Sequence, residues 1–154
     1  ATANVIRSHV LAMYIPSLVS GFLIEKYGLN KIMSIGVIGL LGASLAGMSG
    51  TSVFMYWLAL VLLGVGWNFL YVGGTTMLTY TYEPNERFKA QGLNEFCVFG
   101  ISAFGSLLAG TIMYKFGWFV LVIIPIPFLL MIGVGLIVTN TEVSSLVLKK
   151  RVEN

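Results

Sequence analysis

Four polar residues that could bind or transfer something lie within or beside apolar stretches of the chain: Glu95, Asn94, Asn68 and His9. Glu95 is the only acid inside such a stretch, and ionisable groups within membrane segments are candidates for a functional role. Its carboxylate could take up and release a proton while facing a central cavity. Alternatively, it could anchor a helix end by pairing with Arg87, Lys26 or a base from outside this chain.

The other three candidates also have two interpretations each. Asn68 lies in the middle of an apolar stretch, where its amide needs a partner, either a neighbouring helix or a bound substrate. His9 could have a proton-linked role, because histidine changes charge near neutral pH, or it could be a simple interfacial residue. Asn94 and Gln91 lie beside Glu95 and are expected to join its polar network.

The residue types needed for catalysis are nearly absent. The chain has one His and one Cys, no phosphate-binding loop and no paired carboxylates deep in an apolar stretch. We therefore expect no enzyme activity, no cofactor and no metal site. The basic run Lys149, Lys150 and Arg151 is too short to predict a nucleic-acid site. The expected partners are the lipid bilayer and a small molecule.

The composition predicts what positions these residues. Of the 154 residues 57% are hydrophobic and only 10% are charged, whereas soluble domains have about 25% charged residues. Five apolar stretches approach the roughly 20 residues that cross a bilayer. The sequence thus predicts an all-α polytopic membrane protein with five transmembrane helices, near residues 9–24, 32–48, 53–80, 90–113 and 118–138. A polar, basic tail follows over 139–154, and Pro16 should kink the first helix.

The positive charges predict the orientation. With five helices and short links, seven of the nine Lys and Arg residues fall on one side of the membrane. Positive charges favour the cytoplasmic side. We therefore expect loops 25–31 and 81–89 and the tail to be cytoplasmic, in a cell (inner or plasma) membrane.

Two helix ends share a pattern of glycine, four residues, lysine, an aromatic residue and glycine. The first copy runs from Gly21 to Gly28 and the second from Gly110 to Gly117. Glycine and lysine are both favoured at helix C-termini, so the copies could be two independent caps. Alternatively, they mark an internal repeat, which would be inverted because the two ends face opposite sides of the membrane.

The first of these ends carries a family resemblance. Residues 21–31 are similar to the loop signature of the major facilitator superfamily, in which a glycine, an acid, a base, a second glycine and two basic positions follow at fixed spacing. Glu25, Lys26 and Lys31 match, whereas Asn30 replaces a basic residue. Stretches 9–17, 64–76 and 82–95 strengthen the match. Together they resemble the C-terminal half of a bacterial member, from its eighth to its twelfth helix.

The resemblance implies secondary active transport of a small molecule by alternating access, with an N-terminal half that this chain lacks. It also implies a cytoplasmic latch formed by five loop residues: Gly21, Glu25, Lys26, Gly28 and Lys31. Otherwise the lysines only fix the topology. An alternative of another class is a small standalone membrane protein that acts as a subunit or scaffold. The first residue is not Met, which favours a fragment of a longer carrier.

Overall fold

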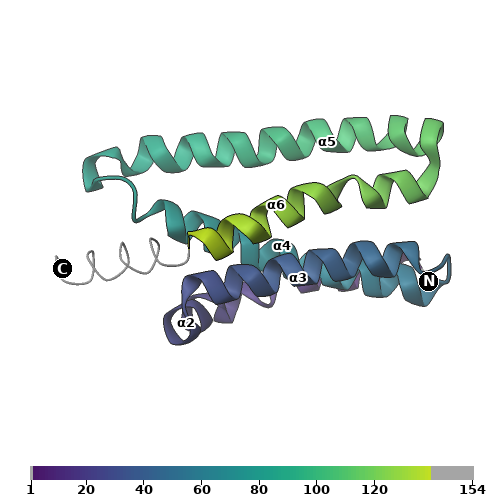
Figure 1. Cartoon of the computed structure of the whole chain (residues 1–154), viewed down its shortest axis with the longest axis horizontal. Helices are drawn as coiled ribbons and strands as arrows, with labels where there is room; N and C mark the ends of the chain where they lie inside the picture. The colour runs from purple at the N-terminus through teal and green to yellow at the C-terminus, as the bar shows by residue number, and fades with distance from the viewer. Residues whose placement is uncertain (1, 140–154) are drawn as a thin grey trace.

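The computed structural model describes residues 2–139, and every element within them is a helix. The helices are α1 (Thr2–Tyr14), α2 (Ser17–Tyr27), α3 (Leu29–Met48), α4 (Val53–Leu78), the short η1 (Pro84–Glu86), α5 (Arg87–Ile123) and α6 (Pro125–Val138). Figure 1 shows them side by side, with α6 between α5 and the α3–α4 pair. The predicted tail lies outside the described residues from position 140 onward.

Five membrane crossings follow from these helices. Helices α3 and α4 are each long and apolar enough to cross a membrane, and so are α1 and α2 when taken together as one bent span. The apolar segment Pro84–Val138 has 55 residues, enough for two crossings of roughly 20 residues. It reverses at Gly117, where φ is 80°, and Figure 1 shows the chain turning back at that end of the bundle. The predicted all-α fold with five transmembrane helices is confirmed.

The first crossing is broken in the middle. Helices α1 and α2 meet at an angle of 41° across Ile15 and Pro16. Proline has no backbone N–H and cannot continue the helical hydrogen bonding. The predicted kink at Pro16 is therefore present. The helices around it extend from Thr2 to Tyr27, beyond the expected bounds of 9–24 at both ends.

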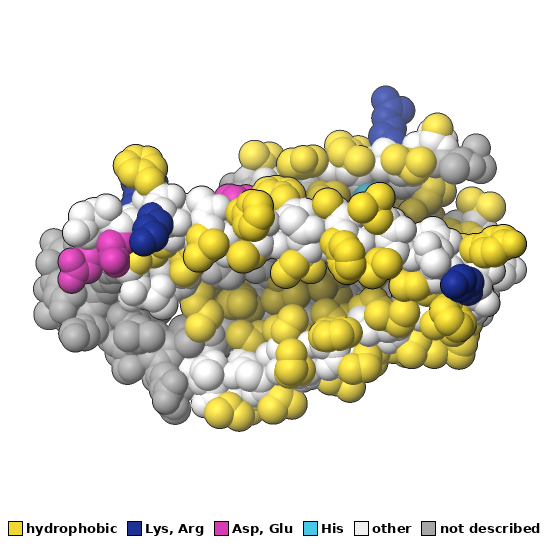
Figure 2. Space-filling model, turned by 90° about the horizontal axis from the view of Figure 1, so that it is seen from above, with side chains coloured by type: hydrophobic (Ala, Val, Ile, Leu, Met, Phe, Trp, Pro, Cys, Tyr) yellow, Lys and Arg dark blue, Asp and Glu magenta, His cyan; other side chains and the backbone are white. Residues whose placement is uncertain are grey.

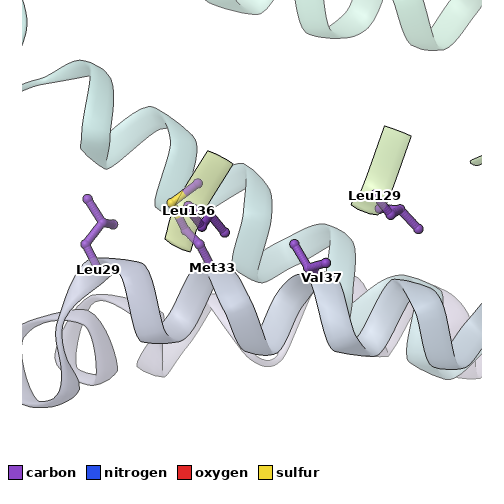
Figure 3. Close-up of a cluster of buried hydrophobic side chains, with 5 residues drawn as sticks. All are labelled: Leu29, Met33, Val37, Leu129 and Leu136. Atoms are coloured by element: carbon purple, nitrogen blue, oxygen red, sulfur yellow. The ribbon is translucent and has the colours of Figure 1, made fainter. Parts of the chain in front are cut away.

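The buried apolar core joins α3 to α6. Leu29, Met33 and Val37 of α3 pack with Leu129 and Leu136 of α6 (Figure 3). Outside this cluster, large hydrophobic side chains are exposed along every long helix. Figure 2 shows hydrophobic side chains over much of one face, with charged side chains mainly toward its ends. Such an apolar surface suits lipid rather than water.

Helix α4 packs closely on two neighbours through glycines. A Cβ on Gly66 would lie 2.8 Å from the Gly36 carbonyl oxygen of α3, and a Cβ on Gly64 would lie 2.8 Å from the His9 carbonyl oxygen of α1. Small residues permit this backbone approach in membrane helices. The contact holds α4 between α1 and α3, and thereby fixes the directions in which its polar side chains point.

Candidate functional site

Asn68 holds the two parts of the broken first crossing. Its side chain is 5% exposed. The amide Nδ2 donates to the Met13 carbonyl of α1 at 2.8 Å, and the amide Oδ1 lies 2.8 Å from the Ser20 hydroxyl of α2. Met13 lies in the last turn before the Pro16 break, where the helix leaves carbonyls without their usual backbone donors. Asn68 thus supplies one donor that the break removes.

Ser20 is the partner that sequence reasoning missed. It is fully buried, and its hydroxyl lies 2.7 Å from the Pro16 carbonyl as well as 2.8 Å from Asn68. Both neighbours are acceptor oxygens, and a hydroxyl has a single proton, so Ser20 shares that proton between them or donates it to one of them at a time. A serine four residues after a mid-helix proline was the available signal, but serine often bonds its own helix in this way.

Glu95 links α5 to α4 through a tyrosine. The Tyr71 hydroxyl donates to the carboxylate, at 2.9 Å from Oε1 and 2.8 Å from Oε2. Asn94 lies next to it, with Nδ2 3.4 Å from Oε1. Glu95 is half-buried. Its recorded partners within residues 2–139 are these two neutral side chains.

The tyrosine that binds this carboxylate lies against two further aromatic rings. The Tyr71 ring stacks on Trp67 with centroids 6.4 Å apart and planes 8° apart, and it lies 6.3 Å from the Phe99 ring at a tilt of 56°. Trp67 and Tyr71 are four residues apart on α4, as are Glu95 and Phe99 on α5, so each pair shares a helix face. This spacing was a signal for the cluster, but the sequence does not say that the two faces meet.

His9 makes a separate contact. Its Nδ1 lies 2.6 Å from the Leu60 carbonyl oxygen of α4. A carbonyl oxygen only accepts, so Nδ1 carries a hydrogen and donates this hydrogen bond. Asn68 and His9 both bind the first crossing to α4, whereas Glu95 and Asn94 lie at the α4–α5 contact. The structure therefore places the four predicted residues in three different contacts.

Four of the five residues of the expected latch, all except Gly21, lie at the α2–α3 turn. Gly28 has φ 91°, a left-handed conformation that glycine adopts without steric cost, and it ends α2 and precedes α3. Glu25, Lys26 and Lys31 are all exposed. The Lys26 ammonium lies 5.2 Å from the centroid of the Tyr27 ring and 5.7 Å from that of Phe22. Gly21 is exposed on α2, with no atom near the position of an added Cβ.

The second copy of the repeated pattern turns in the same way. Gly28 and Gly117 are the two residues with positive φ in the described part of the chain, at 91° and 80°. The α2–α3 junction and the reversal of the chain after α5, which contain these glycines, lie at opposite ends of the bundle (Figure 1). Both interpretations of the pattern, a pair of helix caps and an inverted repeat, accommodate this shared conformation.

The chemical groups of these contacts are carboxylate, aromatic, amide and hydroxyl groups. Among residues 2–139, no group of three or more His, Cys, Asp or Glu side chains is placed to hold a metal. The available groups are one carboxylate, three aromatic rings, amides and hydroxyls. These groups can stack on a flat molecule and exchange hydrogen bonds with it.

Comparison with known proteins identifies the family. The profile of the Major Facilitator Superfamily matches residues 5–153. The chain is 42% identical over 113 residues to a riboflavin transporter, RfnT, of Brucella anthropi, a match that covers 73% of this chain and 28% of the relative. Over 115 residues it is 36% identical to YdeG of Bacillus subtilis, an uncharacterized transporter of the same type, covering 73% and 27%.

A further Bacillus subtilis transporter of this type, YddS, is 36% identical over 111 residues, covering 71% of this chain and 26% of the relative. The chain thus matches little more than a quarter of the length of each of these relatives. No solved structure matches it significantly. The profile match covers nearly the whole chain, and the relatives are named as membrane transporters. This chain belongs to the Major Facilitator Superfamily.

Proposed function

We propose that the chain supplies the C-terminal helices of a secondary active carrier, which moves a small molecule across the membrane by alternating access. The family match over residues 5–153 carries this proposal. The polar contacts of Asn68 and Glu95 support it, because polar groups within membrane helices face partners, cavities or substrates rather than lipid. Riboflavin is the first compound to test as a substrate, since the relative RfnT is named as its transporter.

The proposed partner of these helices is an N-terminal half that packs on α5. This helix has no buried residue within its described length. Ser102, Ser106 and Gly110 recur at intervals of four along it, which places them on one face. Small residues at this spacing let a second helix approach closely. The alternative, a standalone subunit or scaffold, would leave this face to a different protein or to a second copy of the chain.

The mass of the native polypeptide separates these alternatives. It can be measured after extraction from its own membrane, with identification by a peptide from this sequence. A mass well above the 16.8 kDa of this chain is expected for the carrier. A native mass of 16.8 kDa would contradict the carrier and favour the subunit.

Coupling to protons is proposed to involve Glu95. The carboxylate can accept a proton, and it lies on α5, the helix on which the N-terminal half is proposed to pack. Glu95→Gln in the full-length polypeptide, reconstituted in liposomes, should abolish the pH dependence of uptake and slow uptake about a hundredfold or more, the range typical of lost proton transfer.

A matched control for this substitution is Glu83→Gln. Glu83 is exposed in the link before α5, so its neutralisation should leave uptake unchanged. Wild-type uptake and pH dependence in Glu95→Gln would exclude a coupling role. Uptake of no small molecule by the wild-type protein, over a panel that includes riboflavin, would count against the carrier itself.

The charged α2–α3 turn is proposed to act as a cytoplasmic latch. Glu25, Lys26 and Lys31 are exposed, so they are free to pair with groups outside the described residues when helices rock. An exposed ion pair contributes roughly 0–1 kcal/mol, enough to change the ratio of two access states up to about fivefold. Glu25→Gln should shift that ratio, measured as thiol labelling of a cavity cysteine from either side in a Cys97→Ser background.

Lys115→Gln is the control for the latch, because Lys115 lies in the second copy of the pattern, just before the reversal at Gly117. Glu25→Gln raises the net charge by one and Lys115→Gln lowers it by one, so shifts of equal size in opposite directions would mean that net charge, rather than the latch, sets the ratio. The same labelling tests the orientation. A cysteine at Asn85 should react only with reagents that enter the cytoplasm, and one at Lys115 should react from outside.

A further inference from the structure

We propose that Trp67, Tyr71 and Phe99 form a binding surface for a planar nitrogen heterocycle, and that Glu95 binds its polar edge. This inference rests on the proposed carrier function and assigns a substrate class and a site to it. The site lies at the α4–α5 contact. No other contact between these two helices brings aromatic rings and a carboxylate together within the described residues.

The three rings form a cluster across two helices. Trp67 and Tyr71 are nearly parallel, at 8°, and follow each other along α4 with centroids 6.4 Å apart. Phe99 adds a third ring from α5, with its centroid 6.3 Å from that of Tyr71 and its plane tilted by 56°. The parallel pair extends over more than one ring width, so it can stack on a fused ring system, while the tilted Phe99 ring can contact the side of such a ligand. Stacking on aromatic side chains suits flat heterocycles, because every such ligand has a π-face.

The Glu95 carboxylate determines which chemical groups the edge of the ligand has to carry. Both Glu95 oxygens are near the Tyr71 hydroxyl, but that hydroxyl has a single proton, whereas a carboxylate has about four acceptor positions. Acceptor positions therefore remain for N–H or O–H groups of a ligand. Charged acceptors make stronger hydrogen bonds than neutral ones. The preferred ligand is a flat ring system with donors on its edge.

The described part of this chain leaves the surface partly uncovered. Trp67, Tyr71 and Glu95 are half-buried, and Phe99 is 59% exposed. Asn68, by contrast, lies on the same helix with both ends of its amide engaged and only 5% of its surface exposed. Asn68 is therefore committed to holding helices together, while the Trp67–Tyr71–Phe99–Glu95 cluster still presents ring faces and carboxylate lone pairs.

Binding of riboflavin to the purified full-length polypeptide tests this assignment. Riboflavin has a planar fused heterocycle with edge donors, and its own fluorescence is quenched on stacking with aromatic rings. Titration of wild type should show saturable quenching. Trp67→Leu and Phe99→Leu should each weaken binding about tenfold, within the range for loss of one stacking side chain.

Two further variants control for folding and for tryptophan content. Trp57→Leu removes a second stacked tryptophan of α4, which pairs with Phe54 at 5.9 Å near the other end of the helix, and should bind as wild type. Trp67→Phe keeps a ring and should restore binding to within about threefold of wild type. The elution volume of each variant in size-exclusion chromatography is compared with that of wild type, so that loss of binding is separated from loss of fold.

Three results would overturn the proposal. They are absence of riboflavin binding by wild type, wild-type affinity in both Trp67→Leu and Phe99→Leu, and equal weakening in Trp57→Leu. None of them would affect the carrier function, which liposome uptake of other compounds tests separately. Conversely, riboflavin binding without uptake of any compound would support the proposed binding surface. The same result would contradict the proposed carrier function.

Discussion

Helices α4 and α5 are both long and apolar, yet they use their small residues in opposite ways. Glycines of α4 lie against backbone atoms of α1 and α3, at positions where an added Cβ would come within 2.8 Å of a carbonyl oxygen. Gly105 and Gly110 of α5 have no neighbouring atom within 4 Å of such a Cβ. Small residues at helical spacing therefore permit close packing but do not create it, because a partner helix has to be present.

The polar groups of the two helices show the same contrast, because the group on α4 is enclosed by neighbouring helices and the group on α5 is partly accessible. Asn68 of α4 is sealed between α1 and α2, with hydrogen bonds to both. Glu95 of α5 has one strong contact, to Tyr71, and remains half-buried. The α4 amide thus stabilises the packed part of the bundle, while the α5 carboxylate retains acceptor positions for other groups. We expect substitutions of Asn68 and the packed glycines of α4 to affect folding, and substitutions of Glu95 on α5 to affect function.

The largest effect on folding is expected for Gly66→Val. Even the Cβ would lie 2.8 Å from the Gly36 oxygen and 2.9 Å from the Leu40 nitrogen, and backbone atoms cannot move aside cheaply. Overpacking of this kind lowers the free energy of unfolding, and for a contact with backbone atoms we expect a loss of roughly 3 kcal/mol or more. Unfolding in mixed micelles with increasing sodium dodecyl sulfate would measure the loss.

Gly105→Val on α5 is the matched substitution for Gly66→Val. In a protein consisting of this chain alone it should leave the unfolding midpoint nearly unchanged, because open space surrounds the position. A large loss in the full-length polypeptide would show that α5 packs on a segment outside this chain. An unchanged midpoint for Gly66→Val would contradict the close α3–α4 contact.

A smaller loss in the free energy of unfolding is expected for Asn68→Ala. The substitution removes the donor to the Met13 carbonyl and the partner of Ser20, and a buried group left without its partner costs about 1–3 kcal/mol. Asn94→Ala should cost much less, because its contact with Glu95 is long, at 3.4 Å. The same unfolding titration compares the two variants. An equal loss of unfolding free energy in both would mean that the Asn68 amide stabilises the bundle no more than the Asn94 amide does.

The smallest loss in the free energy of unfolding is expected for Trp118→Phe. Trp118, just after the reversal at Gly117, donates from Nε1 to the Gly47 carbonyl of α3 at 2.8 Å, and this bond contributes about 0.5–1.5 kcal/mol. The ring contact with Tyr56 at 5.1 Å would be largely kept by phenylalanine. Trp57→Phe, which keeps a stacked ring against Phe54, is the control, and a larger loss there would contradict the prediction.

Much of the fold was determined by local features of the sequence. Hydropathy and charge are properties of consecutive residues, so they predicted the membrane class, the five helices and the break at Pro16. The charged residues 25–31 and the stretches around them carried the resemblance to the family that the profile match confirms. Glu95 and Asn68 could be selected as candidates because a polar side chain in an apolar stretch is visible without any partner.

The partners of those candidates were decided only by the tertiary structure. Asn68 meets Met13 and Ser20, which are 55 and 48 residues away, and Glu95 meets Tyr71 across 24 residues. Which faces meet depends on the rotation and depth of each helix, and these follow from packing of whole surfaces, such as α4 against the glycines of α3. Helical spacing fixes which residues share a face, whereas only the assembled bundle fixes what that face contacts.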